Sequence, residues 1–174
     1  MSTTTGGILK ASADKKNVKP AEFIWYLIAV FFYTNMTGFV GQYRNVFLVD
    51  VVQISNKQSS LFNVITSIVP YILNFFIVMY IDGRNIGKKG KFRTLIMLAA
   101  IPMGILLFLS FWVPKGISGA LLMIYIITVA ILWSVMNTFG GTINNLAVVM
   151  TPNLKERDTI MSFRGIVSAV GNSA

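Results

Sequence analysis

The sequence contains no cysteine and no histidine, and only six of its 174 residues are acidic. Histidine and cysteine are the usual metal ligands and frequent acid–base or nucleophilic groups, so their absence argues against an enzyme and against a metal centre. Without cysteine, disulfides give no information on the redox compartment. The acidic residues are spread along the chain, and none lies deep in an apolar run: Asp14, Glu22, Asp50, Asp82, Glu156 and Asp158.

Charge of either sign is scarce. Charged residues make up 12% of the chain, against about 25% of a soluble domain, while 55% of the residues are hydrophobic and the mean hydropathy is +0.68. Four runs without Asp, Glu, Lys or Arg each reach roughly the 20 residues that a helix needs to cross a membrane. They are Phe23 to Tyr43, Gln58 to Ile81, Thr94 to Pro114 and Gly116 to Leu154. Lipid forces such runs into helices, which predicts an all-α membrane protein; the scarcity of charge disfavours a soluble protein with four buried helices.

The runs divide the chain into a polar N-terminal tail and a helical bundle. We expect residues 1–22 to be a disordered cytoplasmic tail and residues 23–174 to form the transmembrane bundle. The predicted helices cover about 23–48, 60–81, 94–113, 119–150 and 158–174. The last is too short to cross, so we expect it to belong to a longer protein or to be completed by another chain.

The basic residues set the orientation. Twelve of the fifteen lie in the tail, in the loop after the second helix or around the start of the fifth. This asymmetry predicts a cytoplasmic N-terminus in a multi-pass protein of the cytoplasmic (inner) membrane. It also accounts for the net charge of +9 without a nucleic-acid partner. Four aromatic residues near the predicted membrane ends read as interfacial anchors: Trp25, Tyr26, Tyr43 and Trp112.

Three stretches resemble a known transporter family. The loop "IDGRNIGKKGKFRT" (residues 81–94) has an acid at a helix end, then glycines and basic residues, and resembles the signature loop of major facilitator transporters. Its Gly-Lys-Phe-Arg at 90–93 resembles the glycoside–pentoside–hexuronide cation symporters, the relatives of melibiose permease. "FLVDVVQIS" (47–55) and "MTPNLKERDTIMSFRG" (150–165) resemble two further segments of that family. The resemblance implies a twelve-helix fold in two halves, with the solute near the midplane and this chain as the first five transmembrane helices.

The family's cation-binding carboxylates have no counterpart in this part of the sequence. Carried over by spacing, their positions hold Thr34, Pro70, Asn74 and Thr142. Neutral oxygens coordinate sodium weakly, and proton coupling needs a group that titrates. We therefore expect no cofactor; sodium or proton coupling stays open.

Polar residues within the runs recur at helical spacing, which places them on one face of each helix. Two or three such faces would line a cavity for a hydroxylated solute; the alternative is that they hold helices together. Arg44 is expected either to clamp an acidic group of the solute or to snorkel to the interface. The resemblance places Arg164 near the sugar, with a cytoplasmic anchor as the alternative. The candidate solute-binding residues are Thr34, Arg44, Asn74, Asn137, Thr142, Asn144 and Arg164.

A second group of charges is predicted to latch one conformer at the cytoplasmic face, since ion pairs that form in only one of two states bias their balance. Its members are Asp82, Arg84, Lys88, Glu156 and Arg157. Topological anchoring is the alternative, and it accounts for the basic members better than for Asp82.

The sequence thus predicts the N-terminal part of a secondary transporter that moves a sugar or glycoside by alternating access. The expected partners are a small-molecule solute, membrane lipid and the remaining half of the transporter. A non-transporting membrane subunit or sensor derived from a transporter half is the competing hypothesis, which the missing intramembrane acids favour.

Overall fold

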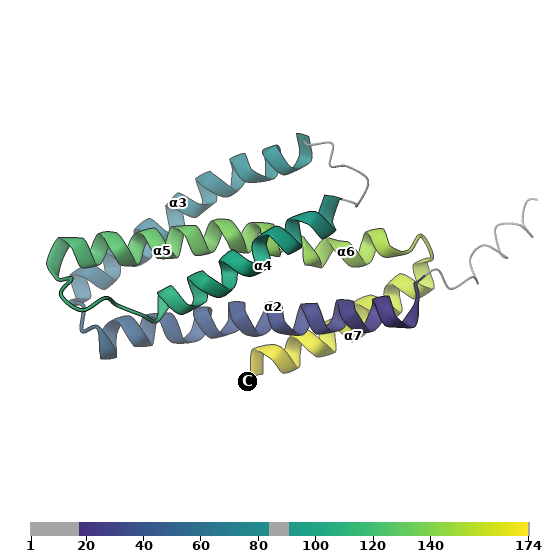
Figure 1. Cartoon of the computed structure of the whole chain (residues 1–174), viewed down its shortest axis with the longest axis horizontal. Helices are drawn as coiled ribbons and strands as arrows, with labels where there is room; N and C mark the ends of the chain where they lie inside the picture. The colour runs from purple at the N-terminus through teal and green to yellow at the C-terminus, as the bar shows by residue number, and fades with distance from the viewer. Residues whose placement is uncertain (1–17, 84–90, 174) are drawn as a thin grey trace, which may run out of the picture. The chain divides into compact units, whose positions relative to one another are not determined.

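The computed structural model describes residues 18–83 and 91–173, and of residues 81, 82, 91–93 and 173 it describes the backbone alone. Every regular element in these ranges is a helix (Figure 1). In chain order they are α2 (Pro20–Val46), a π-helical segment (Phe47–Val51), α3 (Asn56–Gly83), α4 (Lys91–Ser110), α5 (Gly119–Gly140), α6 (Ile143–Met150) and α7 (Leu154–Ser173).

Most helix ends lie within four residues of the predicted ones, as α3 does in beginning at Asn56, and two differences follow from local structure. The run predicted as one helix over 119–150 forms two, because α5 ends at Gly140 and α6 begins at Ile143. The helix predicted from about 158 begins at Leu154, because Asn153 caps it: its Oδ1 accepts the backbone N–H groups of Lys155 at 3.1 Å and Glu156 at 3.5 Å. The predicted tail lies largely outside the described residues, and α2 starts within its last three positions.

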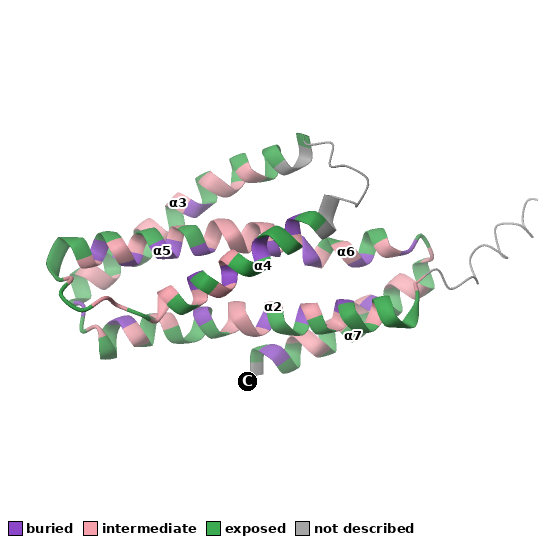
Figure 2. Cartoon of the chain, in the orientation of Figure 1, coloured by how far each residue is buried: buried purple, intermediate pink, exposed green. Residues whose placement is uncertain are grey.

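In the part of the chain that the structure describes, three stretches are long and apolar enough to cross a membrane: Pro20–Val51, Asn56–Tyr80 and Gly119–Met150. The apolar stretch Thr94–Ser110 of α4 is shorter. Large apolar residues are exposed along these helices, and the green bands on α3 in Figure 2 mark its exposed positions. Tyr71 is 79% exposed and Phe75 is 64% exposed. A lipid-facing surface accounts for such exposure, and the molecule is a membrane protein by this measure.

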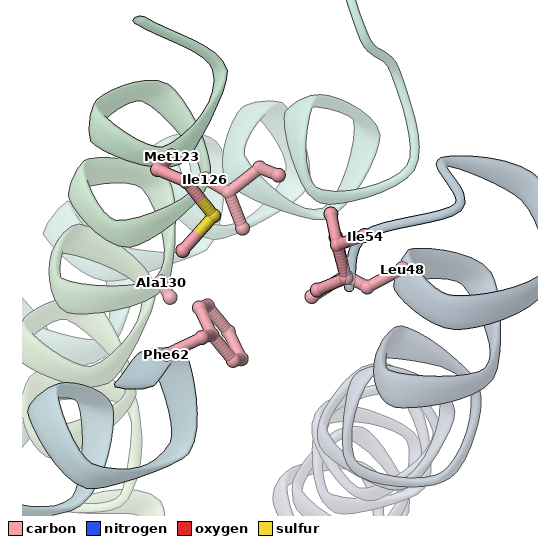
Figure 3. Packing of buried hydrophobic residues seen from close by; sticks show 6 residues of the cluster. All are labelled: Leu48, Ile54, Phe62, Met123, Ile126 and Ala130. Atoms are coloured by element: carbon pink, nitrogen blue, oxygen red, sulfur yellow. The ribbon is translucent and has the colours of Figure 1, made fainter. Parts of the chain in front are cut away.

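By its contacts the chain divides into two units, residues Met36–Thr142 (unit 2) and residues Met1–Asn35 with Ile143–Ala174 (unit 1). In unit 2, α5 packs against both α3 and α4. Its core gathers side chains from the π-helical segment, the turn after it, α3 and α5, and Figure 3 shows them pointing toward one another. These are Leu48, Ile54, Phe62, Met123, Ile126 and Ala130.

Unit 1 holds the first half of α2 beside α7. Three contacts join them in the same order along both helices, so the two run in the same direction. Glu156 Oε1 accepts the Val18 N–H at 3.1 Å, the Phe23 and Phe163 rings meet edge to face at 5.7 Å, and the Thr34 hydroxyl lies 3.5 Å from Ser168 Oγ.

Candidate functional site

In unit 2 the best-defined polar contact between helices joins α3 to α5. The Thr138 hydroxyl donates to Asn74 Oδ1 at 2.6 Å, and it also lies 3.1 Å from the Ser134 carbonyl. Asn74 is a predicted site residue, but its partner Thr138 was not predicted. The signal was present: Ser134, Thr138 and Thr142 recur every four residues, which places three hydroxyls on one face of a helix. In this arrangement Asn74 turns its oxygen to Thr138, so its amide N–H groups are the donors available to a solute.

Two other predicted residues lie at the end of α5. Thr142 is buried, with 7% of its surface exposed, and its hydroxyl donates to the Phe139 carbonyl at 2.7 Å. The Gly141 N–H donates to the Asn137 carbonyl at 2.7 Å. Both contacts satisfy backbone groups where the helix stops. Solute binding by Asn137 and Thr142 stays a prediction, and the one proton of the Thr142 hydroxyl is already engaged.

In unit 1 the structure brings two predicted residues together, Arg164 on α7 and Asn144 on α6. The Arg164 Nη1 donates to the Asn144 carbonyl at 3.2 Å and lies 3.8 Å from Met161 Sδ. Arg164 is half-buried, and its two interpretations, a residue near the sugar and a cytoplasmic anchor, stay predictions. Asn144 contributes its backbone here, a role that its side-chain type does not predict. Since a guanidinium has five N–H donors, several stay available to a ligand.

Tyr26 was expected at the membrane interface and this interpretation is wrong. Only 4% of the residue is exposed, and its hydroxyl is buried without a hydrogen-bond partner in the part of the chain that the structure describes. The sequence signal was the spacing of Tyr26, Val30 and Thr34 at intervals of four, which forms the buried face of α2 in unit 1. A buried, unpartnered hydroxyl is a place where a solute hydroxyl would complete the hydrogen bonding.

Thr34 takes part in the close approach of α2 and α7. It is 9% exposed, and a Cβ added to Gly171 would lie 3.3 Å from Thr34 Cβ and 3.1 Å from Asn35 Nδ2. A methyl group at this position on α7 would therefore make unusually close contacts with the polar face of α2, as where membrane helices approach through small residues. For Thr34 this contact agrees with the alternative given in the sequence analysis, in which polar residues within the apolar runs hold helices together.

The predicted latch is only partly described. Arg84 and Lys88 lie outside the described residues, and so does the side chain of Asp82. Glu156 accepts hydrogen bonds from the Thr151 hydroxyl at 2.6 Å and from the Val18 N–H. Arg157, whose N–H donates to the Asn153 carbonyl at 2.9 Å, sits in the first turn of α7. Glu156 thus ties the entry of α2 to the start of α7; the latch stays a prediction.

Arg44 turns toward the core of unit 2. Its Cζ lies 5.2 Å from the centre of the Phe62 ring, and Phe62 is 1% exposed. Arg44 itself is half-buried. Both interpretations, a clamp for an acidic group of the solute and a side chain that snorkels to the interface, stay predictions.

Residues 22–174 match the family described as MFS/sugar transport protein. The chain belongs to this family. The predicted fold class and the resemblance to major facilitator transporters are confirmed by this match, and membership of the MFS/sugar transport family points to transport rather than to catalysis.

One relative of this MFS/sugar transport chain is a protein of Bacillus subtilis (strain 168) named as an uncharacterized symporter, YjmB. The two are 33% identical over 86 residues, which cover 49% of this chain and 18% of the relative. The chain therefore corresponds to a minor part of that relative's length. No solved structure matches the chain.

Proposed function

We propose that the protein carries a sugar or glycoside across the cytoplasmic membrane by alternating access, and that this chain forms an N-terminal portion of the transporter. The observation that carries the proposal is the family match over residues 22–174, to which the symporter name of a relative adds support. The distribution of basic residues supports a cytoplasmic N-terminus.

Each unit contributes polar groups suited to a hydroxylated solute. In unit 1, the half-buried Arg164 on α7 and the buried Tyr26 hydroxyl on α2 offer hydrogen-bond donors. In unit 2, the amide N–H groups of Asn74 are held in one orientation by Thr138. A few fixed polar groups among apolar walls give a binding site its specificity, because a site built to pair with hydroxyls rejects solutes that lack them.

The competing proposal is a membrane subunit that binds a partner and does not transport. It is favoured by the neutral residues at four positions where the resembling family has carboxylates: Thr34, Pro70, Asn74 and Thr142. Neither proposal assigns a coupling ion.

The test is uptake of labelled melibiose and other neutral glycosides into proteoliposomes with no gradient, a sodium gradient or a pH gradient. We expect uptake above protein-free liposomes, and the gradient that accelerates it names the coupling ion. If a well-inserted protein binds a glycoside but never moves it under any of the three conditions, transport is refuted and the subunit is favoured.

A further inference from the structure

The segment that leads into α2 is joined to α7, within unit 1, by a carboxylate. Val18 lies two residues before α2 and donates its backbone N–H to Glu156 Oε1 at 3.1 Å, across 138 positions of the sequence. A main-chain N–H ahead of a helix has no preceding turn to bond to, so its partner must come from elsewhere. Val18 belongs to the segment expected as a tail, and no sequence pattern predicts this contact.

The same carboxylate also holds the turn between α6 and α7. Glu156 Oε2 accepts the Thr151 hydroxyl at 2.6 Å, and Thr151 is 1% exposed. The Thr151 Oγ1 in turn accepts the Asn153 N–H at 3.1 Å. Asn153 is the residue that caps α7. Glu156 therefore connects the entry of α2 to the residue on which the start of α7 depends.

The two contacts of Glu156 are expected to support one another. A glutamate side chain loses rotamer freedom when it is fixed, and a contact at one oxygen offsets that cost for the contact at the other. Hydrogen bonds that end on a carboxylate are also roughly twice as strong as neutral ones. When the Val18 N–H leaves, Glu156 gains freedom to turn away, and its hold on Thr151 weakens.

We propose that residues 18–20 act as a strap with a seated and a released form, and that Glu156 transmits the difference to the start of α7. In the seated form Glu156 holds Thr151 and, through it, the Asn153 cap; in the released form the first turn of α7 loosens. One hydrogen bond to a charged group biases two such forms by about tenfold. A partner that binds residues 1–17 and prefers the released form by about tenfold would bring the two forms to roughly equal amounts.

The strap does not rest on the proposed function, and it differs from the predicted latch because its donor is a main-chain N–H and not a basic side chain. A substitution can remove this donor alone. Val18→Pro deletes the N–H, while Val18→Ala keeps the N–H and shortens the side chain, which makes it the matched control.

The measurement is hydrogen exchange of the full chain in nanodiscs, followed by mass spectrometry. The reporters at the start of α7 are the Asn153 N–H and the Arg157 N–H, which donates to the Asn153 carbonyl at 2.9 Å. We expect Val18→Pro to speed their exchange by about fivefold or more, and Val18→Ala to leave it near that of the parent. Adding Val18→Pro to Glu156→Ala should bring no further increase, because the acceptor is already gone.

The reverse direction needs no proline. Since coupling between two positions is reciprocal, Thr151→Val should speed exchange of the Val18 N–H by a few-fold, although Thr151 donates to Glu156 and not to Val18. Glu156→Ala should speed it more. Asp158→Ala is the control, because it removes an exposed acid two residues along the same helix.

Equal exchange at Asn153 and Arg157 in the Val18→Pro and Val18→Ala proteins would overturn the proposal. Exchange at Val18 that ignores Thr151→Val would overturn the transmission through Glu156. Neither readout involves a solute, so failure of the strap and failure of the proposed transport are distinguishable.

Discussion

The hydrogen bond from Thr138 to Asn74 is expected to couple α5 to α3. Thr138→Val replaces the hydroxyl by a methyl group of similar volume and removes the 2.6 Å contact. A hydrogen bond between side chains of membrane helices contributes about 0.6 kcal/mol on average and up to about 1.7 kcal/mol. The short distance and the partly buried position favour the upper part of this range, about 1 kcal/mol, or roughly a fivefold change in the unfolding equilibrium.

The assay is a double-mutant cycle on the detergent-solubilised protein, with Thr138→Val, Asn74→Ala and both together, read as the free energy of unfolding. We expect a coupling energy of about 0.5–1.5 kcal/mol. Thr66→Val is the matched control on α3, because its hydroxyl donates at 2.7 Å to the Phe62 carbonyl of its own helix. It should show no coupling to Asn74. If the two single changes add to within about 0.3 kcal/mol, the contact does not join the helices and the reasoning fails.

Other contacts and the charge pattern lead to four more expected outcomes. Tyr26→Phe should leave the free energy of unfolding unchanged or raise it by about 1 kcal/mol, because it removes a buried unpartnered hydroxyl. The same change should weaken glycoside binding, as measured by calorimetry. A lower free energy of unfolding with unchanged glycoside binding would contradict this prediction. Gly171→Ala should destabilise the protein by roughly 1–3 kcal/mol through overpacking against Thr34 and Asn35. Thermal unfolding checks this, with Gly165→Ala as the control because Gly165 has open space around it. Ser118→Cys should react with an impermeant reagent from outside intact cells and Gly90→Cys should not, and the reverse pattern would overturn the proposed orientation. Asp82→Asn should lower the external reactivity of a cysteine introduced in place of Gln42 if Asp82 is a latch, and equal reactivity would leave it a topological anchor.

The positions of the helices were predictable because hydrocarbon offers the backbone no hydrogen-bond partners, so a segment within it must form a helix. A run without charge over the thickness of a membrane must bond its own amides, so Asn56–Gly83 and Gly119–Gly140 fall where the uncharged runs do. The ends were less predictable, since they depend on single local contacts. Asn153 starts α7 four residues before the predicted position by accepting two backbone N–H groups.

The site was less accessible to sequence reasoning because it depends on which way individual side chains turn. Tyr26 lies next to Trp25, and both types are common at membrane interfaces. Trp25 is 69% exposed and Tyr26 is 4% exposed, a difference decided by which face of α2 meets α7. Threonine is likewise common where helices pack together, so nothing in the residue type marks Thr138. Thr138 becomes a hydrogen-bond partner only because Asn74 on α3 lies opposite it.

The interruption between α5 and α6 has a consequence for hydration. A helix that stops inside an apolar run leaves backbone groups without their usual partners, and hydrocarbon supplies none. Here Gly141 and Thr142 return hydrogen bonds to Asn137 and Phe139, while Thr142 and Ile143 are 7% and 2% exposed. This stretch of the fourth run is therefore covered by protein, not by acyl chains. Hydrogen bonds of the turn take the place of hydration at the end of α5, in a segment whose hydropathy alone describes one unbroken helix.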